Sequence, residues 1–247
     1  MPYFDNIGLP HQSCEPQTAD QLLEMLDQIA RKAGAGLRPI LHFDTHGDAT
    51  HGIKLTSGAF VPWPDLVVRL RAINVATGNN LCVVSGVCFS MNAIRQVKLC
   101  EACPFFILIA PANEVSSGFL EDKTLAFYKS LFEGLEIVAA HARWLAPNLA
   151  LFHCERMLTY LLAGYVREYC IGRGGNERRE QLLTKAIAAN LGHTRADRRR
   201  IRRAAKTWTR PSEAMVERFA GGLASKFLMR KPLGFDIADV MKFVKDA

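Results

Sequence analysis

Residues 37–47 read LRPILHFDTHG and residues 81–90 read LCVVSGVCFS, and these two stretches decide the fold. Each begins with a short apolar run and ends in polar or small residues. This is typical of a buried parallel strand that carries functional groups at its carboxyl end. We therefore expect strands over residues 37–43 and 81–85, and the apolar run at 105–110 predicts a third strand of the same sheet.

Helical patterns lie between these strands. Thr18 and Gln21 have the spacing of a capping box, and Pro64 stands where a helix would begin. Alternation of strands and helices predicts an α/β fold, with a mostly parallel sheet that helices cover on both faces. Ligands of such sheets bind beyond the carboxyl ends of the strands. The expected helices cover residues 18–34, 64–73, 93–97 and 125–132, and residues 52–61 have the alternation of a hairpin.

The chain changes character near residue 148. From there we find no strand pattern, only helical periodicities, so we predict an α/β domain over 1–147 and a basic, all-helical region over 148–247. Residues 171–210 hold 12 Lys and Arg against 3 Asp and Glu, whereas the whole chain has a net charge of +7. This concentration indicates a contact with nucleic acid or an acidic protein, although charge runs are more often solvated helix faces. Trp208 is the only aromatic residue in that stretch, which argues against base stacking as the main mode of recognition.

Composition excludes several classes of protein. The chain has 7 cysteines, an odd number, which is not the pattern of a secreted disulfide framework. Cys100 and Cys103 form a C-x-x-C pair, but the two further ligands of a structural zinc site are missing nearby. We find no signal peptide and no apolar run of about 18 residues, so we expect a cytoplasmic protein without a membrane contact. No phosphate-binding glycine motif is present, and we expect neither a nucleotide cofactor nor a metal.

The ends of the first two strands carry the candidate chemistry. Thiol catalysis needs a cysteine nucleophile, a nearby imidazole and backbone N–H groups aimed at the oxyanion. Cys88 and His46 supply the first two, and the N–H groups of Gly47 and Cys88 are the candidate oxyanion hole. Asp44 and Asp48 could bind an Arg or Lys side chain of a substrate, or could simply stabilise their own turn. Cys82, Cys154, Cys170, His141 and His153 are expected to be structural.

These elements together resemble the caspase-like cysteine peptidases. A strand ending in His46-Gly47, a hairpin, a helix and a strand ending in Cys88 follow each other in that family's order. The likeness is greatest to the CHAT branch, in the Cys88-Phe89-Ser90 segment, in the hairpin over 52–61 and in the helical segment 126–134, followed by Ala139 and Ala142. It covers residues 37–146.

The resemblance implies a cysteine endopeptidase that acts on a protein substrate, with residues 1–147 as its peptidase domain. It also implies that the enzyme stays inactive until a regulatory or sensor partner triggers it, as in prokaryotic antiviral defence or programmed cell death. Two features depart from the family pattern. Only one helix fits comfortably before the first strand, so the sheet is trimmed or is completed by a partner, and Val87 is bulkier than the small residue that often precedes the nucleophile.

Two other interpretations stay open. In the first, the chain is a metal-dependent hydrolase whose His/Asp cluster holds the ion, although later strand ends offer only Cys88 and Asn113 as further ligands. In the second, the caspase-like fold is a catalytically silent adaptor that binds nucleic acid or protein through its basic helices. The residues of the metal-site interpretation are His42, Asp44, His46, Asp48 and His51.

Overall fold

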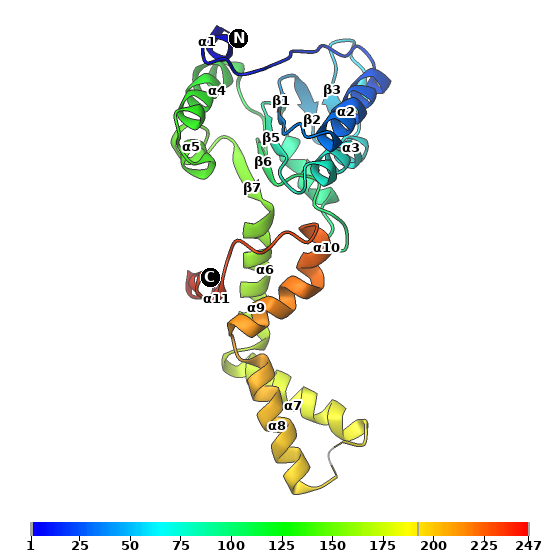
Figure 1. Cartoon of the computed structure of the whole chain (residues 1–247), viewed down its shortest axis with the longest axis vertical. Coiled ribbons are helices and arrows are strands. Elements are labelled where there is room, and N and C mark those ends of the chain that lie inside the picture. Colours follow the sequence, from blue (N-terminus) through cyan, green and yellow to red (C-terminus); the bar gives the residue numbers. More distant parts are fainter. Residues whose placement is uncertain (1, 192, 247) are drawn as a thin grey trace. The chain divides into compact units, whose positions relative to one another are not determined.

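The computed structural model describes residues 2–191 and 193–246 (Figure 1). The chain forms two compact units. The first unit contains residues 1–77, 81–96 and 108–151, and the second contains 78–80, 97–107 and 152–247. The candidate catalytic residues lie in the first unit, and the arginine-rich stretch lies in the second.

The first unit is built on a mostly parallel sheet whose strand order is β1-β5-β6-β7. Strand β1 (Ile40–Phe43) runs parallel to β5 (Cys82–Ser85), with Ile40 opposite Cys82 and Phe43 opposite Ser85. Strand β6 is Ile107–Ala110. All three expected strands are therefore present, each slightly shorter than its apolar run, and the α/β class is confirmed.

The fourth strand, β7 (Ala150–His153), corrects the sequence interpretation. We expected residues 148–247 to be all-helical, but β7 lies beside β6 at the end of the sheet. It is only 4 residues long and leads directly into a helix at Cys154, so it is too short to produce a recognisable alternation. Its extended conformation depends on pairing with the neighbouring strand, which a local pattern does not encode.

Helices flank this sheet (Figure 1). Helix α2 (Ala19–Gly34) begins with the expected capping box, in which Gln21 N donates to Thr18 Oγ1 at 3.2 Å. Helix α2 packs against α3 (Trp63–Ala76), and α4 (Ser117–Phe132) packs against α5 (Ile137–Trp144). A short helix α1 (Pro2–Asn6), which the sequence pattern did not predict, lies near the amino end. The helix expected after Cys88 is present as the 3-10 helix η1 (Ser90–Gln96).

A small antiparallel sheet follows β1 directly. Its strands are β2 (His46–Asp48), β3 (Gly52–Lys54) and β4 (Phe60–Val61), in the order β2-β3-β4. The hairpin expected over 52–61 is therefore present, with β2 added on one side. Ile53 and Val61 are opposite each other and are fully buried, which anchors the small sheet to the core.

The second unit is mainly helical. Helix α6 (Cys154–Tyr169) packs against α7 (Gly172–Ala188) and α11 (Ile237–Asp246), and α7 packs against α8 (Arg195–Thr209). Helix α9 (Glu213–Phe219), the π-helical turn η2 (Ala220–Ala224) and α10 (Ser225–Phe227) complete the unit. Phe227, Leu228 and Leu158 form part of its buried core together with Cys103 and Cys154. No helix in the described residues is both long enough and apolar enough to cross a membrane.

Candidate functional site

The His46-Gly47 segment is held in place by the small sheet. His46 lies opposite Lys54 in the β2–β3 pair, and Thr45 Oγ1 donates a hydrogen bond to Lys54 O at 2.7 Å. The side chain of His46 is exposed to solvent. Because only 2 residues separate β1 from β2, the imidazole is carried close to the carboxyl end of the parallel strand β1.

The Cys88 segment leaves the neighbouring strand at the same edge. After β5 ends at Ser85, Gly86 N donates to Phe43 O at 2.8 Å, so the pairing with β1 continues for one more residue. Val87 is fully buried, and Cys88 is half-buried. Phe89 then has a positive φ of 61°, which is uncommon for a residue with a large side chain. This sharp turn separates β5 from η1.

Gly47 lies directly against the Cys88 segment. A β-carbon built at position 47 would overlap Val87 Cγ1 and would lie 2.5 Å from the backbone oxygen of Cys88. Only glycine allows two backbones to approach this closely. The structure therefore brings the His46-Gly47 and Val87-Cys88 segments into contact, as expected for adjacent strand ends.

Backbone groups of a third loop surround the thiol. Val115 N donates to Cys88 Sγ at 3.4 Å, and the thiol lies 3.8 Å from Val115 O. Val115 belongs to the loop between β6 and α4, and Phe89 N donates to Asn113 O in the same loop. In the described residues, the N–H of Cys88 makes no hydrogen bond, which leaves it free to donate to a ligand. The loop follows the third predicted strand, so its place at this edge of the sheet could be expected from the sequence. Its contacts with the sulfur come from backbone atoms, which no residue type in the sequence identifies.

The two candidate carboxylates have different surroundings. Asp48 Oδ1 accepts hydrogen bonds from Thr50 N, His51 N and His51 Nδ1, each at 2.8 Å. These hydrogen bonds lower the pKa of Asp48, and the two from backbone N–H groups contribute most. Asp48 therefore stabilises its own turn, the alternative that its residue type allowed. Asp44 is exposed, and no hydrogen bond or ion pair to its carboxylate is found among the described residues.

His42 does not join the His46-Gly47 and Val87-Cys88 segments. Its Nδ1 lies 3.0 Å from Tyr128 Oη, and the two rings meet edge to face. Desolvation by the surrounding protein lowers the pKa of His42, and the negative charge of Asp44 partly opposes this effect. Part of the surface of His42 remains exposed to solvent. Across the described residues, no group of three or more His, Cys, Asp or Glu could hold a metal ion. The metal-site interpretation thus lacks a ligand set there.

The cysteines and histidines that the sequence analysis expected to be structural are wholly or partly buried, or hydrogen-bonded within the fold. Burial raises the pKa of Cys82 to about 12, which keeps it a thiol, and Cys154 and Cys170 are buried. His141 Nε2 lies 2.7 Å from Leu149 O, and His153 Nδ1 accepts from Glu155 N at the start of α6.

Comparisons with protein-family models, with curated proteins and with solved structures found no match.

Proposed function

We propose that this chain is a caspase-like cysteine endopeptidase that uses Cys88 as nucleophile and His46 as its acid–base partner. The observation that carries the proposal is the contact of Gly47 with the side chain of Val87 and the backbone of Cys88. It joins an exposed imidazole, a half-buried thiol and an unpaired backbone N–H, all in the described part of the chain, at one edge of the sheet. These are the groups that thiol-mediated acyl transfer requires.

In the proposed reaction, His46 accepts the proton of the Cys88 thiol and the sulfur attacks the carbonyl carbon of a peptide bond. The N–H groups of Cys88 and Gly47 stabilise the oxyanion. His46 then protonates the leaving amine as the C–N bond breaks, and an acyl-enzyme remains. Water attacks the thioester, which releases the carboxylic acid and restores the thiol. Asp44, the carboxylate without a partner in the described residues, lies just after β1, where it can attract a basic substrate side chain.

Regulation by a partner is part of the proposal, with a role in prokaryotic antiviral defence or programmed cell death as its biological setting. The contact between Val115 and the Cys88 sulfur supports it, because the thiol is already engaged by its own chain. A change in the loop between β6 and α4 would release the sulfur for attack.

The test is proteolysis in cells that express the full chain together with candidate partner proteins. Protein fragments should appear with the wild type and disappear with Cys88→Ala and with His46→Gln. Cys14→Ala is the matched control, since Cys14 is an exposed cysteine outside the site. Fragments that persist in Cys88→Ala would refute the proposal.

A second measurement works without an activator. Alkylation of Cys88 at neutral pH should be about tenfold slower in His46→Gln, because the imidazole no longer removes the thiol proton. Labelling of Cys14 in the same sample provides the internal reference. An unchanged alkylation rate of Cys88 would show that His46 does not remove the proton of the thiol. It would contradict the proposed pairing of His46 with Cys88.

A further inference from the structure

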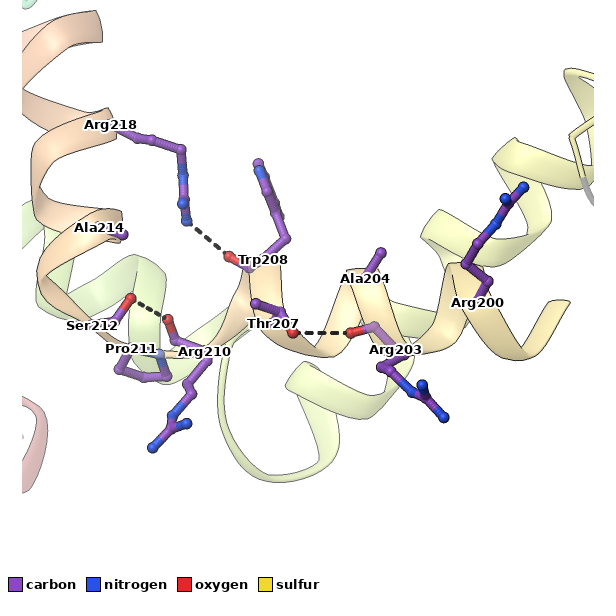
Figure 2. A pocket seen from close by; sticks show the side chains of 10 residues that line it. All are labelled: Arg200, Arg203, Ala204, Thr207, Trp208, Arg210, Pro211, Ser212, Ala214 and Arg218. Atoms are coloured by element: carbon purple, nitrogen blue, oxygen red, sulfur yellow. Dashed lines mark hydrogen bonds between the residues drawn. The ribbon is translucent and has the colours of Figure 1, made fainter. Parts of the chain in front are cut away.

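The second unit contains an open pocket between α8 and α9, with a volume of about 780 Å³ (Figure 2). We call it the arginine groove. Its charged and aromatic lining consists of Arg200, Arg203, Trp208, Arg210 and Arg218.

The local sequence explains why these side chains face outward. Ala205 and Thr209 are buried on one face of α8, which packs against α7. Arg203 lies on the opposite face of the helix, and Arg210 is the C-cap residue that follows Thr209. Ala204, which also lines the groove, has a short side chain; in Figure 2 it points to the same side of α8 as Trp208, and Arg203 and Arg210 point to the other side.

The positive charge in the groove is only partly compensated. Arg200 forms an ion pair with Asp197, in which Nη2 lies 3.5 Å from Oδ1. Arg203 and Arg210 are exposed and make no ion pair with any described residue. A second basic pocket of about 520 Å³, lined by Arg195, Arg199 and Arg202 among others, lies on the same helix. Arg202 in this second pocket pairs with Glu180 at 3.3 Å. Both pockets are lined by arginines of α8, which has 15 residues and a length of about 22 Å.

Trp208 gives this surface an aromatic component. Arg218 Nη2 donates to Trp208 O at 2.9 Å, and its guanidinium lies over the indole ring, 5.3 Å from the ring centre. The arginine thus holds the ring from one side, while Trp208 remains 45% exposed. An exposed indole held beside a cation is a platform on which a nucleic-acid base can stack.

We propose that the arginine groove binds a single-stranded nucleic acid, with Arg203 and Arg210 on backbone phosphates and Trp208 stacked on a base. The preference for arginine over lysine supports phosphate as the anion, because the guanidinium makes paired hydrogen bonds to phosphate oxygens. An acidic protein would satisfy the charge, but the exposed face of the Trp208 indole favours a nucleic acid, whose bases stack on aromatic rings. This inference is independent of the proposed peptidase activity.

The experiment measures the binding of the full chain to a labelled single strand of about 16 nucleotides by fluorescence anisotropy, from about 50 to 200 mM salt. The double variant Arg203→Gln/Arg210→Gln should weaken binding. The salt slope, which is the slope of the logarithm of the binding constant against the logarithm of the salt concentration, should decrease in magnitude by about 1.4. This is about 0.7 for each phosphate that no longer pairs with an arginine. The control Lys32→Gln/Lys226→Gln removes the same charge from positions outside the groove and should leave the slope unchanged.

A third variant tests the indole. Trp208→Leu should raise the Kd for the single strand at least fivefold, while binding to a duplex of equal charge changes less. Circular dichroism confirms that each variant is folded.

Three results would overturn the inference: no saturable binding at the lowest salt, an equal weakening in the groove and control variants, or no effect of Trp208→Leu. Polyglutamate that competes as well as the oligonucleotide would assign the groove to an acidic protein instead.

Discussion

Replacing Gly47 with alanine tests the contact between the His46-Gly47 and Val87-Cys88 segments. The added methyl group would overlap Val87 Cγ1 and would lie 2.5 Å from the backbone oxygen of Cys88. Overpacking of this kind costs about 1–3 kcal/mol, and the backbone oxygen cannot rotate away as a side chain could, so the cost falls near the upper end. Position 47 does not have a positive φ, so alanine also restricts the unfolded chain and recovers about 0.4–1 kcal/mol. The expected net destabilisation is about 2 kcal/mol.

Hydrogen–deuterium exchange measures this destabilisation in the first unit separately from the second. Peptides from β2 and β5 should exchange roughly 30-fold faster in Gly47→Ala than in the wild type, because a destabilisation of about 2 kcal/mol corresponds to that factor. Gly118→Ala is the matched control, since no atom lies within 4 Å of a β-carbon built there. Helix α4 begins at position 117, so that substitution should be neutral or slightly stabilising.

Proteolysis or alkylation of Cys88 gives a second readout of the same variant. Displacement of the Cys88 backbone should change the alkylation rate in Gly47→Ala and leave it unchanged in Gly118→Ala. Exchange within about twofold of wild type, together with an unchanged alkylation rate, would show that the two segments are not in contact and would refute the geometric argument.

The remaining predictions concern thiol chemistry, pH and packing. Alkylation at about pH 8 followed by mass spectrometry should label Cys88 and not Cys82, because burial raises the pKa of Cys82 to about 12; equal labelling would contradict this. Since burial lowers the pKa of His42 below its unfolded value of about 6.5, folding favours the neutral ring, and the free energy of unfolding should decrease as the pH falls through about 6.5. In His42→Gln, denaturant titrations at about pH 7.5 and about pH 5.5 should differ less than in the wild type, and an identical difference would exclude His42 as the cause. Phe227→Ala should destabilise the second unit by about 3–5 kcal/mol, because the ring is fully buried, and a decrease below about 1 kcal/mol in a urea titration would be inconsistent with that core.

The central strands could be predicted because each is a short apolar run with polar residues after it. Leu81 to Ser85 has this form, and the parallel pairing of β5 with β1 follows the expected order. Strand β7 could not be predicted, since its 4 residues become a strand through a neighbour far away in the sequence. The helix expected after Cys88 is present as the 3-10 helix η1 and begins earlier than predicted, because apolar spacing over one or two turns does not distinguish a 3-10 helix from an α-helix.

The candidate site was only partly predictable. The positions of His46 and Cys88 follow from their places after two strands, and the close approach at Gly47 confirms that these strand ends meet. The hydrogen bonds of Val115 to the sulfur come from main-chain atoms, which every residue type possesses, so no sequence pattern marks them. The turn formed by Asp48 was one of two alternatives that its residue type allowed, and only its bonding geometry distinguishes between them.

The hydrogen bond from Val115 N to the Cys88 sulfur links this thiol to the start of α4. Ser116, the next residue along the chain, caps that helix by accepting a hydrogen bond from Phe119 N at 3.3 Å. Helix α4 begins two residues after Val115, the residue whose N–H donates to the sulfur, so a displacement of the amino end of α4 would also displace Val115. A partner that binds α4 and displaces its 16 residues would thus change the hydrogen bond at the Cys88 sulfur without contacting the sulfur itself.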